Sequence, residues 1–134
     1  MILNSFELNL TEQKIKKIQA TIAEVDNDTS VAPFLLKLEL DSLSVFLNEL
    51  VEERDEFLEI SQKFKHKIPV KKEVLKHPEN LVYIRIANDI SQEDVAALLN
   101  VSTEEVKRQE EYLYRNLDSI SLLKINDFLE EKIS

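Results

Sequence analysis

Residues 91–111 decide the fold, and they read SQEDVAALLNVSTEEVKRQEE. Two helix starts lie in this stretch. Ser91 stands three residues before Asp94, and Ser102 stands three residues before Glu105. A serine followed at this spacing by an acidic residue is typical of a helix N-terminus, where the hydroxyl caps free backbone amides. The pattern predicts one helix over about 92–99 and a second that follows Ser102.

The turn between these helices requires a residue that tolerates a left-handed backbone conformation. Asn100 stands where a positive φ is needed, and the chain contains no glycine to fill such a position, so asparagine is the next best residue. Ala96 is small enough to let two helices approach closely. Two short helices joined in this way predict a helix-turn-helix. The apolar residues expected to form its small core are Val95, Leu98, Leu99, Val101 and Val106.

The stretch resembles the Xre/Cro-type, lambda-repressor-like DNA-binding domains. Their pattern is Gln, two polar residues, an apolar residue, Ala, then Gly-Val-Ser at the turn. Glu110 matches a position that is commonly acidic in the family, whereas Gln109 replaces an apolar residue and implies looser packing of the second helix. The layout of the whole chain is similar to that of antitoxin-like Xre regulators. The matching residues are Gln92, Val95, Ala96 and the turn Asn100-Val101-Ser102.

This resemblance implies a dimeric repressor that binds double-stranded operator DNA, in some cases together with a basic toxin partner. Lys107 or Arg108 is expected to read guanine, Glu104 to accept from cytosine, and Gln92 to hold a phosphate or an adenine. The alternative for Lys107 and Arg108 is pairing with Glu104 and Glu111 on the same helix. The expected DNA-contacting residues are Gln92, Ser102, Thr103, Glu104, Lys107, Arg108 and Glu111.

Helices are also expected on both sides of this stretch. Pro78 is expected to open one that ends near Asn88, and the last is expected over about 119–131 with one apolar face. Near the N-terminus, Thr11 is a candidate N-cap for a helix that ends in the turn-forming residues 26–30. The apolar stripe of that first helix is Ile15, Ile18, Ile22 and Val25.

A long helix is predicted from Pro33 to about residue 62. Its apolar positions follow a heptad spacing, which predicts an antiparallel hairpin with the first helix, completed by a second chain. The alternative is a helix that packs only within its own chain. The residues expected to contact a dimer partner or another protein are Leu36, Leu40, Leu43, Leu47, Leu50 and Phe57.

Residues 63–77 are rich in lysine and contain Pro69, so we expect a linker rather than a continuous helix. The concentrated positive charge makes this segment a candidate for phosphate contacts, and the alternative is a solvated linker that balances the acidic helix before it. The expected phosphate-contacting residues are Lys65, Lys67, Lys71 and Lys72.

Composition bounds the remaining possibilities. The chain has 134 residues, no glycine, no cysteine and three prolines, which predicts an all-α protein with a helical hairpin (1–64), a basic linker (65–77) and a helix-turn-helix domain (78–134). Without glycine there is no P-loop or dinucleotide-binding motif, and without cysteine no disulfide. No apolar run is long enough for a membrane span. We therefore expect a cytoplasmic protein without catalytic residues, metal or cofactor.

Net charge weighs against DNA binding. The chain carries −9, and residues 78–134 hold six basic and twelve acidic side chains, a net charge of −6. An acidic domain binds DNA only if its docking face is locally positive. The two functions that the sequence supports are therefore a DNA-binding repressor and a protein-binding module that keeps the helix-turn-helix fold without DNA.

Overall fold

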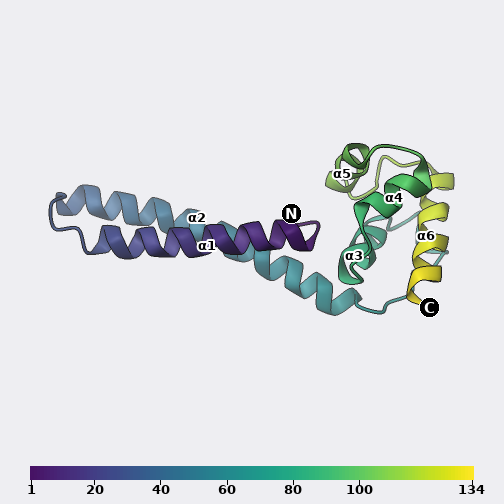
Figure 1. Ribbon diagram of the computed structural model, residues 1–134, viewed down its shortest axis with the longest axis horizontal. Helices are drawn as coiled ribbons and strands as arrows, with labels where there is room; N and C mark the ends of the chain where they lie inside the picture. Colours follow the sequence, from purple (N-terminus) through teal and green to yellow (C-terminus); the bar gives the residue numbers. More distant parts are fainter. The chain divides into compact units, whose positions relative to one another are not determined.

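The computed structural model describes residues 1–134, and its regular elements are all α-helices (Figure 1). The prediction of an all-α protein is therefore confirmed. No helix in the structure is both long and apolar enough to cross a membrane. In chain order the helices are α1 (Ser5–Asp26), α2 (Pro33–Phe64), α3 (Glu79–Ala87), α4 (Gln92–Leu99), α5 (Thr103–Glu111) and α6 (Ser119–Ile133).

The chain divides into two compact units. The first comprises Ile2 and Asn4–Phe57, and the second comprises Met1, Leu3 and Leu58–Ser134. The division falls inside α2, at residue 57 rather than at the predicted residue 64. Residues 65–77, which were expected to form a linker, belong to the second unit.

In the first unit, α1 begins earlier than the sequence predicts. The side chain of Asn4 accepts a hydrogen bond from the Glu7 backbone amide at 2.8 Å and so caps the helix. Thr11 is not the cap. It lies within α1, four and seven residues before Ile15 and Ile18, and all three are buried on the same helix face.

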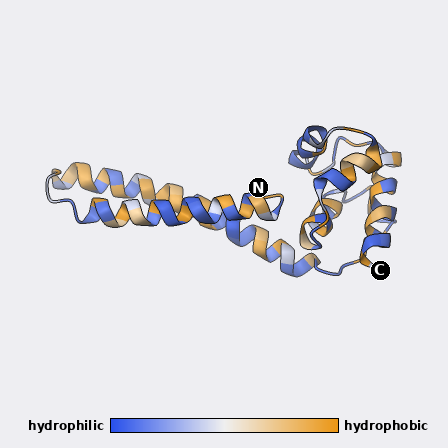
Figure 2. Ribbon diagram, viewed as in Figure 1, coloured by the Kyte–Doolittle hydropathy of each residue, from blue (hydrophilic) through white to orange (hydrophobic).

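The apolar seam of α2 packs against α1 of the same chain. Ile15 and Ile18 of α1 form a buried cluster with Leu50, and Leu43 and Leu47 pack against it. Figure 1 shows α1 running beside the first part of α2 in the opposite direction, and Figure 2 shows hydrophobic and hydrophilic residues alternating along both helices. α1 of the same chain therefore covers the central leucines of this seam. The contact of the seam with a second chain stays a prediction.

Four helices and the segment before them build the second unit. Every one of these helices contributes side chains to its core, and these include the fully buried Val82, Val95, Val106, Ile125 and Leu129. Val101, which was expected in this core, is 41% exposed. It follows the turn residue directly, and its backbone amide bonds to Ala96 O at 3.0 Å while its side chain faces solvent.

Left-handed residues end three of these helices in a chain without glycine. The residues are Asp89 after α3, Asn100 after α4 and Leu113 after α5, with φ values of 55°, 56° and 54°. In each case the next backbone amide bonds back to the last helical turn, for example Tyr114 N to Gln109 O at 2.9 Å. This pattern is the Schellman motif, which satisfies carbonyl groups that a helix end leaves open.

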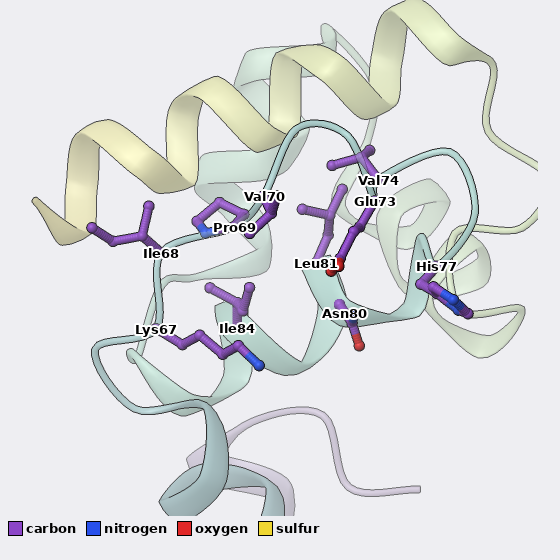
Figure 3. A pocket seen from close by; sticks show the side chains of 10 residues that line it. All are labelled: Lys67, Ile68, Pro69, Val70, Glu73, Val74, His77, Asn80, Leu81 and Ile84. Carbon is purple, nitrogen blue, oxygen red and sulfur yellow. The ribbon is translucent and has the colours of Figure 1, made fainter.

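The lysine-rich segment is packed rather than extended. Pro69 and Val74 are buried, and together with Leu81 and Ile84 of α3 they line a shallow open hollow (Figure 3). In Figure 3 the segment folds back across α3, so its apolar side chains anchor it. The prediction that Pro69 prevents a continuous helix is confirmed, but the segment is a folded part of the second unit.

Candidate nucleic-acid interface

Local hydrogen bonds fix α4, the turn and α5 as the sequence predicts. Ser91 Oγ accepts from the Asp94 amide, and Ser102 Oγ accepts from the Glu105 amide, both at 3.1 Å. Asn100 adopts φ 56° and ψ 45°, which is the left-handed conformation expected there. The two caps and the turn residue are therefore confirmed, and they set where α5 begins.

The two sides of α5 differ sharply in burial. Val106 and Glu110 are 1% exposed and hold the helix against the core. The other side carries Glu104, Lys107, Arg108 and Glu111, all exposed. Their spacing of three, four and seven residues places them on one helix face. At the start of the helix Ser102 is exposed and Thr103 is half-buried. Six of the seven predicted DNA-contacting residues therefore lie together on or beside the free side of α5.

Gln92 is the exception, and its prediction is corrected. Its side chain is 3% exposed, and its Nε2 donates to Glu110 Oε1 at 2.7 Å. An amide held in this way inside the unit does not reach a phosphate or a base. Gln92 instead joins the start of α4 to the buried side of α5, which fixes the position of one helix on the other.

Glu110 lies at the centre of a buried hydrogen-bond network. Arg85 of α3 binds it in a bidentate manner, Nε to Oε2 and Nη2 to Oε1, both at 2.6 Å. Tyr114 donates its hydroxyl to Oε2 at 2.6 Å, and Arg85 further donates to the backbone carbonyls of Ile90 and Leu3. A buried carboxylate needs such compensation. The network thereby locks α3, α4 and α5 together behind the exposed side of α5.

Sequence reasoning missed the role of Arg85. The signal was present, since Arg85 interrupts an otherwise apolar run, LVYIRIA over 81–87. An arginine inside such a run either faces solvent or finds a buried carboxylate. Glu110 was noted only because the corresponding position is commonly acidic in the Xre/Cro-type domains that the sequence resembles.

Burial raises the pKa of the Tyr114 phenol well above its ordinary value, and the nearby negative charge of Glu110 acts in the same direction. The phenol therefore stays protonated and remains a donor to Glu110. This bond ties the loop after α5 to the same carboxylate that anchors α4.

Arg108 has a partner on its own helix. Its Nη2 donates to both carboxylate oxygens of Glu105, at 2.7 and 2.6 Å, and this contact lowers the pKa of Glu105 and raises the pKa of Arg108. Pairing with an acidic neighbour was the alternative to DNA contact, but the partner is Glu105 rather than Glu104 or Glu111. The pair is solvent-exposed, with Arg108 at 64%, so a phosphate or a base can replace Glu105 at little cost.

The lysine-rich segment lies apart from α5. Lys71 Nζ is 3.4 Å from Asp127 Oδ1 of α6. Side chains of the segment and of α3 together line the hollow in Figure 3. Figure 1 shows α5 at one end of this unit and the connection after α2 at the other. The structure therefore does not bring the four predicted phosphate-contacting lysines together with the exposed side of α5.

The lysine-rich segment makes the net charge of the second unit less negative than that of residues 78–134 alone. Residues 58–134 contain twelve basic and fourteen acidic side chains, a net charge of −2, whereas residues 4–57 contain five basic and twelve acidic ones, a net charge of −7. The acidic character of the chain is thus concentrated in the first unit. The electrostatic objection to DNA binding by the second unit is correspondingly weaker.

No protein-family model, curated protein or solved structure matches this chain.

Proposed function

We propose that the chain is a DNA-binding transcriptional regulator of the Xre type, in which α4, the turn at Asn100 and α5 form the helix-turn-helix. The observation that carries the proposal is the exposed side of α5. It presents Lys107 and Arg108 on a helix whose opposite side is fixed by Val106 and Glu110. A rigid helix with free polar side chains on one side fits the major groove, which is wide enough to admit an α-helix.

Each exposed side chain has a role in this proposal. Arg108 leaves Glu105 and donates to O6 and N7 of guanine, a bidentate contact worth about 1–3 kcal/mol of discrimination against other bases. Lys107 contacts guanine or a phosphate, and Glu104 accepts from the N4 amino group of cytosine. Ser102 and Thr103, at the helix N-terminus, contact phosphate and set the register of α5 on the duplex.

The lysines of residues 65–77 have a weaker role. Lys71 pairs with Asp127 of α6, and Lys67 lines the hollow beside α3. We propose that these lysines raise the local potential of the unit without direct phosphate contacts. Screening limits this contribution to about 10 Å at 0.1 M salt. We propose that direct contacts are made by α5 and that the chain acts as a homodimer, as a palindromic operator requires.

A second candidate function is a protein-binding module without DNA affinity. The observation that favours it is the net charge of −7 in the first unit, with acidic residues concentrated over 49–56 of α2. Such a surface attracts a basic protein, for example the toxin of a toxin–antitoxin pair. The two functions are compatible, because they use different units of the chain.

The absence of cysteine allows a direct test of the position of α5. A single Val101→Cys substitution places a reactive thiol beside Ser102, at a position that is 41% exposed. An iron chelate attached there cleaves nearby DNA. We expect cleavage at defined positions of a duplex from the protein's own promoter. Glu24→Cys, at an exposed position of α1, is the matched control and should give only background cleavage.

Two results would contradict the proposal. One is a folded, labelled protein that leaves the promoter duplex unbound at low salt. The other is bound protein whose chelate at position 101 cleaves no better than the chelate at position 24, because the bound surface would then lie elsewhere.

A further inference from the structure

A second apolar row on α2 lies opposite the seam that packs on α1. Phe34, Leu38 and Val45 are spaced four and seven residues apart and therefore share one side of the helix. They are 72%, 50% and 60% exposed. Leu35 and Phe46, at 56% and 48%, lie next to them. A row of large exposed apolar side chains of this extent is unusual for a surface without a partner.

The same side of α2 changes character after Phe46. Glu49, Glu52 and Glu56 continue the row, and all three are exposed. The outer side therefore has an apolar half over 34–46 and an acidic half over 49–56. A partner that covers the apolar half has to avoid the acidic half unless it is basic.

From this layout we infer that a second copy of the chain docks on the row, with the two α2 helices antiparallel about a two-fold axis close to Glu39 and Leu40. The midpoint of the row from Phe34 to Val45 lies there. Antiparallel pairing then places Phe34 of each chain near Val45 of the other, so the apolar halves cover each other. An isologous contact of this kind is closed and self-complementary.

Charge complementarity points to the same axis. Lys37 and Asp41 are exposed, four residues apart, and flank the row on one side. Their midpoint is residue 39, so antiparallel pairing sets Lys37 of each chain opposite Asp41 of the other. Two symmetric ion pairs then border the apolar contact. A parallel two-fold pair instead places these residues of the two chains on opposite flanks of the contact, so they form no ion pair between chains.

Antiparallel pairing also separates the acidic halves. At about 1.5 Å per residue, Glu52 lies roughly 19 Å from the axis and roughly 38 Å from its copy along the paired helices. This exceeds the screening length of about 10 Å at 0.1 M salt. In a parallel pair the acidic halves would lie side by side. The inference names the surface of the proposed dimer but concerns residues 4–57 alone, and its test contains no DNA.

The first test is the mass of the protein in solution, measured by light scattering after size-exclusion chromatography. We expect the wild type to have the mass of two chains and Leu38→Glu with Val45→Glu to have the mass of one. Ile120→Glu, at a 69% exposed position of α6, is the control and should keep the mass of two chains. Circular dichroism checks that each variant is helical.

Charge reversal provides a test that loss of folding does not mimic. Lys37→Asp or Asp41→Lys alone should shift the protein towards the mass of one chain, and the two together should restore the mass of two chains. Cysteine variants report the orientation. Ser42→Cys, near the axis, should be linked by a short thiol crosslinker, whereas Glu52→Cys should not.

Three outcomes overturn the inference. They are a wild type with the mass of one chain, a Leu38→Glu/Val45→Glu variant that keeps the mass of two, and crosslinking of Glu52→Cys but not of Ser42→Cys. The first would show that a second copy does not cover the row, and the last would rule out the antiparallel contact. None of them decides whether α5 binds DNA, which the cleavage experiment tests separately.

Discussion

Glu110 shows how one residue organises the second unit from inside. Its carboxylate is buried and receives hydrogen bonds from Arg85, Gln92 and Tyr114. A buried ion pair adds little net stability compared with a well-packed apolar pair, but the loss of one partner leaves an uncompensated charge. The network therefore fixes the relative positions of α3, α4 and α5 and makes them sensitive to single substitutions.

Arg85→Met should lower the free energy of unfolding by about 3–5 kcal/mol, because it removes one partner of a buried ion pair and leaves Glu110 without its cation. Urea unfolding followed by circular dichroism measures the change. Combining Arg85→Met with Glu110→Leu should recover much of the loss. Arg108→Met, which removes the exposed partner of Glu105, is the control and should leave the unfolding midpoint unchanged. Equal effects of Arg85→Met and Arg108→Met would show that Glu110 is not buried.

Tyr114 makes the free energy of unfolding depend on pH in the alkaline range. Its pKa in the folded protein is raised by burial, so above its unfolded pKa of about 10 the unfolded chain binds fewer protons than the folded one. The contribution of Tyr114 to stability is complete below that pH and is lost as pH rises through the folded pKa. The free energy of unfolding should fall above pH of about 10.

Tyr114→Phe should flatten that alkaline decline, whereas Tyr112→Phe, at a 56% exposed position, should leave it as in the wild type. Ultraviolet absorbance titration gives an independent readout, because the Tyr114 phenol should ionise only as the protein unfolds. A phenol at position 114 that titrates near its ordinary pKa in the folded protein would contradict this assignment.

At the scale of elements, the turn between α4 and α5 depends on one backbone conformation. Asn100 has φ 56°, which Ala adopts at a cost of about 1 kcal/mol and Gly without strain. Asn100→Ala should therefore lower the unfolding midpoint, and Asn100→Gly should keep or raise it. Thermal unfolding of the two variants measures the difference. Equal midpoints would show that the left-handed conformation is not required at this turn.

Most helix boundaries were predictable from local chemistry. The caps at Ser91 and Ser102, the turn at Asn100 and the start of α2 at Pro33 each depend on a few neighbouring residues, and the structure places them as predicted. Thr11 failed because two residue types that cap helices occur near the N-terminus, and Asn4 stands first. A local sequence pattern does not show which of two candidate N-cap residues begins the helix.

Long-range contacts were much less predictable. The heptad seam of α2 was correctly recognised as apolar, but the pattern does not say whether α1 or a second chain covers it. Gln92 matched a family position, yet its side chain is used inside the unit because Glu110, eighteen residues later, comes within 2.7 Å. Arg85 was missed for the same reason. Burial of a polar side chain depends on a distant partner that periodicity does not reveal.

At the scale of the whole molecule, charge and apolar surface are divided between the two units. The first unit carries −7 and the exposed apolar row of α2, and the second carries −2 and the exposed side of α5. A regulator that dimerises through one unit and binds DNA through the other would have this distribution. The acidic unit also opposes nonspecific binding to nucleic acid, because it repels phosphate.

The salt dependence of DNA affinity distinguishes direct phosphate contacts of the lysine-rich segment from its long-range electrostatic effect. Each phosphate contact contributes about 0.9 to the slope of log affinity against log salt concentration. We expect the slope to change by less than about 1 when Lys65, Lys67, Lys71 and Lys72 are all replaced by Gln. Titration of a labelled duplex at several salt concentrations gives the slope. A decrease near the value for four lost contacts would place these lysines on the DNA.

The proposed function requires that α5 give the protein sequence-specific affinity for DNA. The most direct measurement is fluorescence anisotropy of a labelled duplex from the protein's own promoter, compared with a scrambled duplex of equal length at two salt concentrations. We expect tighter binding to the promoter duplex, weakening at higher salt, and loss of that preference in Lys107→Ala/Arg108→Ala but not in Lys14→Ala/Lys17→Ala. A folded wild type that binds neither duplex at low salt would contradict the proposed function.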